Sequence, residues 1–215
     1  MEDIQKMIAV QRGDLAALLA DLPEQRWDEP TLCAGWRVAE VVAHITMPFR
    51  YSSRRFMLEL AKSRGNFSQM ADRRARQDAR ELTVAELTAA LAKNVDHPWK
   101  PPGGGYLGAL THDVIHALDI TVPLGIGWAV PAERLGTILP SMTTPKIIRY
   151  FGTEVTGVEL RATDMDWAFG SGPPVTGSAQ DLALVLCGRK LPPGHLEGEH
   201  SARFTARFTA RFTAA

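Results

Sequence analysis

Apolar residues recur at the spacing of an α-helix through most of the first 150 residues, and the connections between the periodic stretches are short. The first stretch, residues 2–22, stops at Pro23 and has its apolar positions at Ile4, Ile8, Leu15, Leu18, Leu19 and Leu22. A second stretch begins near Trp36 and runs through Ser63, and we expect Pro48 to bend or break it. Several amphipathic helices joined by short loops bury their apolar faces most simply as a four-helix bundle.

Capping and turn residues place further helices. Thr83 is followed three residues later by Glu86, a capping box that begins a helix ending before His97 and Pro98. The run PPGGG at residues 101–105 is the clearest loop in the chain. Two more helical segments are expected, at about 106–124 and at 131–151 with interruptions at Pro140 and Pro145. We therefore predict a mainly α domain over residues 1–150.

The pattern changes after residue 150. Residues 157–176 alternate and turn in the manner of short strands, and residues 178–187 form a compact apolar segment closed by Gly188, which predicts a helix. We predict a small α+β domain over residues 151–201. The tail, residues 202–215, repeats Ala-Arg-Phe-Thr three times. It is either a loosely docked extension or a helix with Phe204, Phe208 and Phe212 on one face.

Composition narrows the class of protein. The 215 residues carry 24 basic and 24 acidic side chains, so there is no net positive charge to attract nucleic acid. The two cysteines, Cys33 and Cys187, are far apart and form no disulfide framework, which favours a reducing compartment. The N-terminus lacks the pattern of a signal peptide, and no run reaches the ~18 apolar residues of a membrane span. We expect a cytoplasmic protein with no membrane partner.

Three histidines have the spacing of a metal site. His112 and His116 are four residues apart in an expected helix, so both imidazoles project from one face. His44 lies late on an apolar face of another helix and can supply a third nitrogen, leaving other positions of the ion open for water or substrate. The alternatives are buried or surface histidines without a metal, and a zinc-protease pattern, HDVIH, with aspartate in place of glutamate.

A longer motif surrounds the first of these histidines. The stretch WDEPTLCAGWRVAEVVAHI, residues 27–45, resembles the opening of the mycothiol-dependent maleylpyruvate isomerase family within the DinB-like superfamily. The matching positions are Trp27, Pro30, Thr31, Cys33, Gly35, Trp36 and His44. A later helix with His112, His116 and Asp119 resembles the second signature of that family, and GVELRATDMDWAF with VTGSAQDLALVLCGR resembles its small C-terminal domain. The resemblance implies a DinB-like four-helix bundle that binds a divalent metal, followed by a small α+β domain.

The resemblance also implies the ligands. His44, His112 and His116 are the expected metal ligands, with zinc as the expected ion and nickel as an alternative. The isomerases proper have glutamate at the position of His112, so this chain resembles the all-histidine sites found elsewhere in the superfamily. Three neutral ligands leave the ion its full charge, which favours an anionic fourth ligand such as a thiolate or hydroxide. Asp119 is either an outer partner that orients an imidazole or a residue of a helix-end salt bridge.

The charges are unevenly distributed. Residues 50–80 hold nine basic and three acidic side chains, whereas residues 1–49 hold eight acidic and four basic ones. Helical spacing puts Arg50 and Arg54 on a related face just after His44, where they are candidates to bind a carboxylate of substrate or cofactor. The alternative is a solvated basic face.

These features favour a metal-dependent enzyme that uses a low-molecular-weight thiol, mycothiol by resemblance. A bound ion would lower the pKa of the thiol, and the thiolate would then attack a small electrophile, giving S-transfer or isomerisation. Cys33 is a possible protein nucleophile, but its place in the motif favours packing. A hydrolase that activates water and a non-catalytic, stress-related metal-binding protein are the alternatives.

Overall fold

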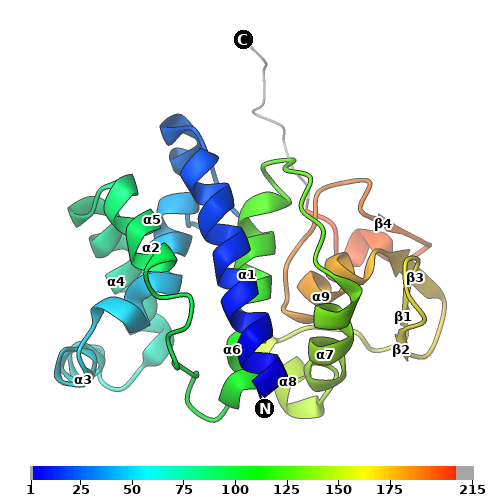
Figure 1. Ribbon diagram of the computed structural model, residues 1–215. Helices are drawn as coiled ribbons and strands as arrows, with labels where there is room; N and C mark the ends of the chain where they lie inside the picture. Colours follow the sequence, from blue (N-terminus) through cyan, green and yellow to red (C-terminus); the bar gives the residue numbers. More distant parts are fainter. Residues whose placement is uncertain (1, 207–215) are drawn as a thin grey trace. The chain divides into compact units, whose positions relative to one another are not determined.

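The computed structural model describes residues 2–206 and divides the chain into two compact units, Met1–Ile126 and Gly127–Ala215. Each unit is described by itself. The described residues are mainly helical, and those of the second unit include one small sheet (Figure 1). Within residues 2–206, each helix is too short or too polar to span a bilayer.

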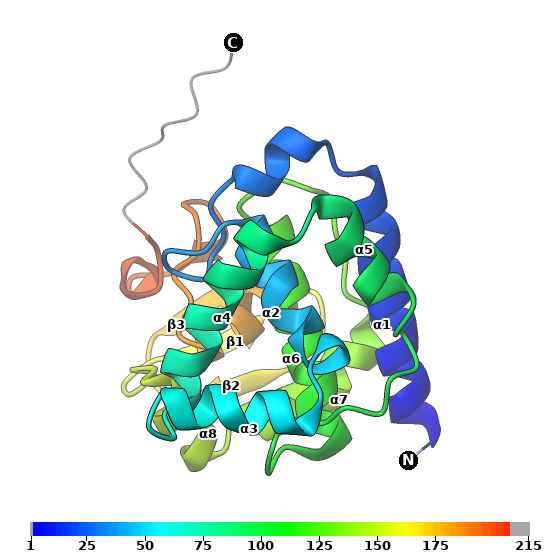
Figure 2. The same cartoon turned by 90° about the vertical axis from the view of Figure 1, so that its left-hand side faces the viewer.

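The first unit is a four-helix bundle. Helix α1 packs against α5 and α6, and α2 packs against the same two helices, so the four form a closed ring. Helix α4 covers the outer side of α2 (Figure 2). The elements of this unit are α1 (Glu2–Asp21), the 3₁₀ turn η1 (Glu24–Asp28), α2 (Val38–Arg50), α3 (Ser53–Lys62), α4 (Phe67–Glu81), α5 (Val84–Ala92) and α6 (Gly105–Thr121).

Helix α2 is the most buried element of the bundle, since Val38, Val41 and Val42 are fully buried. The break expected at Pro48 is confirmed: the helix ends at Arg50, and α3 begins three residues later. Pro48 lacks the N–H that would bond to the carbonyl four residues earlier, which weakens the helix end. Ser52 then caps α3 by accepting a hydrogen bond from the backbone N–H of Arg55 at 3.3 Å.

Helix α4 was not predicted, because its sequence is polar. Its inner face combines Met70, Ala71 and Ala75 with the ion pair of Arg74 and Asp78, both nearly inaccessible to solvent. A buried pair of charges at i, i+4 spacing hides the apolar periodicity that identifies most helices. The capping box of α5 is confirmed: Glu86 accepts a hydrogen bond from the backbone N–H of Thr83 at 2.8 Å.

The second unit is an α+β structure. Its sheet has the strand order β2-β1-β3-β4, with β1 parallel to β3 and the outer pairs antiparallel. Leu160 of β1 lies opposite Val175 of β3, and both are fully buried. The elements are α7 (Ala132–Met142), α8 (Pro145–Phe151), β1 (Glu159–Ala162), β2 (Ala168–Gly170), β3 (Pro174–Gly177), α9 (Ala179–Leu186), β4 (Leu196–Glu197) and the 3₁₀ turn η2 (Ser201–Arg203).

The division between the units falls after Ile126, earlier in the chain than the boundary expected at residue 150. Helix α7 packs on α9, and the Gln180 side chain accepts from the backbone N–H of Val130 at 3.0 Å, so residues 127–151 join the second unit. Pro140 does not interrupt α7, because it lies close to the helix end, where it removes little of the hydrogen-bond ladder. Pro145 begins α8, as expected of a proline in a first turn.

The first Ala-Arg-Phe-Thr repeat is docked, but not as an α-helix, since its first two residues end the 3₁₀ turn η2. Phe204 is buried, and its carbonyl accepts a hydrogen bond from the backbone N–H of Leu191 at 2.9 Å. Arg203 donates to the carbonyl of Glu154 at 2.7 Å. Phe208 and Phe212 of the predicted aromatic face lie outside the described residues.

An ion pair in the second unit gives its stability a predictable pH dependence. His195 Nδ1 lies 3.0 Å from Asp181 Oδ1, and this hydrogen bond raises the pKa of His195 above 6.5. A raised folded-state pKa contributes stability that is complete below the unfolded value and is lost as pH rises through the folded value. We expect His195→Gln to be less stable than the wild type by about 0.5 kcal/mol at pH 5.5, since the pair is partly exposed to solvent.

The difference in stability between His195→Gln and the wild type should shrink between pH 5.5 and pH 8.5, because rising pH removes the proton that gives His195 its charge. Urea unfolding at the two pH values measures it. A difference that grows with pH would contradict the assignment.

Candidate metal centre

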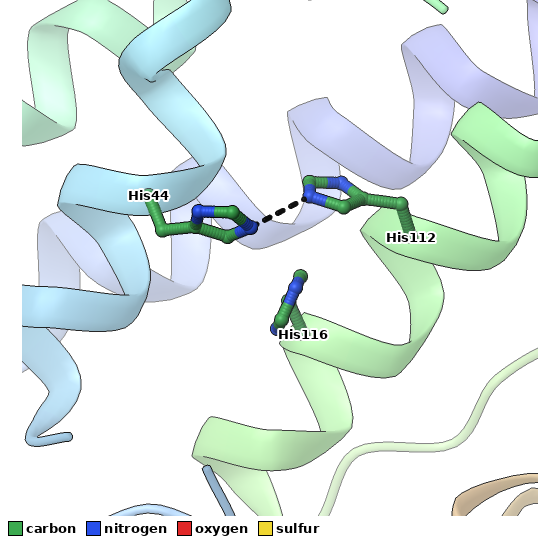
Figure 3. A group of neighbouring side chains, drawn as sticks. All are labelled: His44, His112 and His116. Carbon is green, nitrogen blue, oxygen red and sulfur yellow. Dashed lines mark hydrogen bonds between the residues drawn. The ribbon is translucent and has the colours of Figure 1, made fainter. Parts of the chain in front are cut away.

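Three imidazoles meet inside the first unit. His44 projects from α2, and His112 and His116 project from successive turns of α6 (Figure 3). The Nε2 atoms of His44 and His112 are 3.3 Å apart, and one ligand atom from each of the three residues lies within 4.8 Å of the others. The side chains of His112 and His116 are only 16% and 12% exposed. The structure thus brings together the three histidines singled out in the sequence.

Carboxylates fix the rings of both α6 histidines. His112 Nδ1 donates to Asp113 Oδ1 at 2.9 Å, and His116 Nδ1 donates to Asp119 Oδ2 at 2.9 Å. A carboxylate only accepts hydrogen bonds, so Nδ1 of each ring carries a hydrogen, and in the neutral ring the lone pair is on Nε2. Carboxylates placed in this way orient metal-ligating histidines in many proteins.

The donor set fits a divalent cation with a preference for nitrogen. Zinc–nitrogen distances of about 2.0–2.1 Å at a tetrahedral angle place two nitrogens about 3.4 Å apart. The separation of 3.3 Å between His44 and His112 agrees with this spacing and also suits an N–H···N hydrogen bond without metal. Three protein nitrogens would leave at least one coordination position open.

The loop before α2 is built around the motif residues. Thr31 closes it, because its hydroxyl donates to the Trp36 carbonyl at 2.9 Å and accepts from the Cys33 N–H at 3.2 Å. Gly35 has φ of +77°, a conformation that favours glycine. The backbone N–H of Leu32 bonds to the carbonyl of Asp119 at 3.0 Å, so this loop is attached to the end of α6.

Two side chains of the same loop, Cys33 and Trp36, lie beside the histidines. Cys33 Sγ donates to Asp119 Oδ2 at 3.0 Å and lies 3.8 Å from His116 Nδ1. The Trp36 ring contacts that of His44 with centroids 5.2 Å apart, and its indole N–H donates to Asp72 at 2.7 Å. A hydrogen bond from Arg76, reinforced by Trp36, lowers the pKa of Asp72 and keeps this acceptor ionised.

A second tryptophan contacts the cluster from the loop between α5 and α6. The rings of Trp99 and His112 have centroids 5.0 Å apart. The backbone N–H of Trp99 donates to His97 Nδ1 at 3.2 Å, and burial together with the charge of Arg12 lowers the pKa of His97, which keeps it a neutral acceptor. Indole rings therefore lie against two of the three imidazoles.

Comparison with known proteins identifies the family to which this chain belongs. The family model for the mycothiol maleylpyruvate isomerase N-terminal domain matches residues 8–121, more than half of the chain. The chain belongs to the mycothiol maleylpyruvate isomerase family. The matched segment includes all three histidines, Cys33 and Asp119.

Relatives of this family member are similar over nearly their whole length. An uncharacterised protein of Mycobacterium tuberculosis, named Rv0036c in strain H37Rv and MT0041 in strain CDC 1551, is 24% identical over 220 residues, which cover 85% of this chain and 84% of that protein. The crystal structure of mycothiol-dependent maleylpyruvate isomerase has the same fold, with a TM-score of 0.54 and 14% identity. A histidine-to-alanine mutant of that enzyme gives 0.59 and 13%. Each superposition covers 93% of both chains.

The sequence predicted that Arg50 and Arg54 share a helix face, but in this member of the isomerase family they lie on different helices. Helix α2 ends at Arg50, and Arg54 is exposed on α3. Arg50 binds Asp78 Oδ2 at 2.7 Å and the carbonyl of Ala43 at 2.8 Å. These contacts tie α2 to α4 and give no support to a cofactor-binding role for the pair.

Sequence reasoning missed two residues behind the cluster, Asp113 and Arg12. Asp113 directly follows a candidate ligand, and an acid beside a histidine is the one local signal that was available. Arg12 of α1 donates to Asp113 Oδ2 at 2.7 Å, and the two residues are 101 positions apart in the sequence. No local sequence pattern predicts a contact over such a separation.

Proposed function

We propose that this protein is a metal-dependent enzyme that uses a low-molecular-weight thiol, mycothiol, either to isomerise a small electrophile or to transfer the thiol sulfur to it. The observation that carries the proposal is the convergence of His44, His112 and His116 with carboxylates on the outer nitrogens of two of them. Membership of the mycothiol maleylpyruvate isomerase family supports the choice of thiol. Maleylpyruvate is accordingly the first electrophile to test.

A divalent cation, when bound by the three histidines, would lower the pKa of a thiol and make its thiolate available at neutral pH. The residues of the chain supply the rest of the site. Asp113 and Asp119 hold the α6 imidazoles as Nδ1–H tautomers with Nε2 directed inward. Trp36 and Trp99 provide apolar surface beside the rings, which excludes water and strengthens electrostatic interactions at the site.

Cys33 acts in this proposal as a hydrogen-bond donor and not as the nucleophile. Its Sγ–H donates to Asp119 at 3.0 Å, on the Nδ1 side of His116, whereas a metal ion would bind at Nε2. The attacking sulfur therefore comes from a small thiol, which agrees with a thiol-dependent family.

The experiment is a thiol-dependence assay on protein loaded with zinc or nickel. Maleylpyruvate and other small electrophiles are supplied with mycothiol, with S-methyl mycothiol as the matched control that cannot form a thiolate, and with no thiol. We expect turnover only with free mycothiol and only before metal removal by a chelator. Turnover without thiol would identify a hydrolase instead, and failure of the protein to bind any divalent ion would contradict an enzymatic metal site.

A further inference from the structure

Arg12 is a buried cation beneath the histidine cluster. It lies on α1, and only 1% of its side-chain surface is exposed. Its guanidinium donates through Nε to Asp113 at 2.7 Å and through Nη1 to the carbonyls of His97 at 2.8 Å and Val95 at 3.3 Å. One planar group thus joins α1, α6 and the loop that follows α5.

The carboxylate of Asp113 and the loop after α5, which Arg12 holds by hydrogen bonds, are each in contact with His112. Asp113 accepts from Arg12 through Oδ2 and from His112 Nδ1 through Oδ1. The loop held at His97 carries Trp99, whose ring contacts that of His112. Arg12 therefore bears on this one imidazole by two routes, through its hydrogen-bond acceptor and through the ring beside it.

Stability alone does not explain such a residue. A buried ion pair is often no more stabilising than well-packed apolar side chains of similar size, because both charges lose their hydration. The rigid fork of arginine, by contrast, sets several acceptors at fixed directions from one centre. Here those acceptors are the carboxylate and the loop that bear on His112.

We propose that Arg12 is a positioning residue for the metal ligand His112. It fixes the orientation and tautomer of the ring from α1, through Asp113 and the loop bearing Trp99. This inference rests on the proposed function in taking His112 as a ligand.

The test compares Arg12→Met with Arg74→Met. Arg74 is a matched control, because it is 4% exposed and forms a buried ion pair with Asp78 in the same unit, between α2 and α4. Zinc dissociation constants are measured by competition with a chromophoric chelator. We expect Arg12→Met to weaken zinc binding by ~10-fold or more, the scale seen when outer partners of a ligand are lost. Arg74→Met should lower the thermal unfolding temperature and leave the zinc dissociation constant unchanged.

A second variant guards against misfolding from an uncompensated buried charge. Arg12→Met combined with Asp113→Asn removes both charges and retains an amide oxygen for His112 Nδ1, and we expect zinc binding still ~10-fold weaker than in the wild type. Zinc binding as tight as that of the wild type in both Arg12 variants would overturn the proposal.

Imidazole ¹⁵N spectra of the metal-free proteins give a readout that does not depend on metal. We expect the Nδ1–H tautomer of His112 in the wild type and in Arg74→Met, and averaging of the two tautomers in Arg12→Met. A native tautomer in Arg12→Met would overturn the positioning role even if the wild type bound no metal. Absence of metal binding by the wild type would instead count against the proposed function.

Discussion

Combined replacement of His44 and His116 by alanine is expected to abolish stoichiometric binding of divalent metal. The two residues come from different helices, so the double variant leaves His112 as the one donor of the cluster. The loss should exceed the ~10–100-fold that follows removal of an outer partner, because donors themselves are deleted. Metal content after zinc loading and dialysis measures the effect.

The same variant should also lose its stabilisation by zinc. A ligand at 100 times its dissociation constant stabilises the folded state by ~2.7 kcal/mol, so zinc should raise the unfolding temperature of the wild type and leave that of the double variant unchanged. His200→Ala is the control, since His200 lies just before η2 in the second unit. Retention of one bound ion by the His44/His116 variant would show that the three histidines are not the metal site.

Replacement of Asp119 by asparagine is expected to weaken zinc binding by ~10–100-fold. Asp119 is fully buried and accepts from both His116 Nδ1 and Cys33 Sγ through Oδ2. Asparagine has a single acceptor oxygen and no charge, so its hydrogen bond holds the imidazole less strongly. The variant should also unfold at a lower urea concentration, because a neutral amide oxygen accepts these two hydrogen bonds more weakly than a carboxylate does. Competition titration and urea unfolding measure the two effects.

Cys33 variants separate orientation from chemistry at the same carboxylate. Cys33→Ser keeps a hydrogen-bond donor for Asp119 and should bind zinc as the wild type does. Cys33→Ala should lose ~0.5–1.5 kcal/mol of folding stability, the usual net contribution of one hydrogen bond. Both variants should retain thiol-dependent turnover. If both bind zinc normally and neither turns over substrate, Cys33 is the nucleophile and not only a hydrogen-bond donor.

Local sequence patterns predicted most of the helices of this protein, because their signals lie within a few residues. The apolar spacing of α1, the capping box at Thr83 and the stop near Pro48 each depend on neighbours in the chain. Helix α4 was not predicted from the sequence, because the buried ion pair of Arg74 and Asp78 occupies positions that apolar residues usually fill. The structure divides the chain after Ile126 and not near residue 150, because α7 packs on α9, a partner that the amphipathic pattern of α7 does not reveal.

The sequence by itself determined that His112 and His116 share a helix face, because spacing within one helix is set by the geometry of the backbone. The motif around Cys33 and Trp36 indicated the family and, by resemblance, the third histidine. Only the tertiary structure decided that Arg12 holds Asp113 and that Cys33 donates to Asp119, across 101 and 86 positions of sequence. Such contacts follow from how α1 and the loop before α2 pack on α6, and a packing geometry has no periodic signature in the chain.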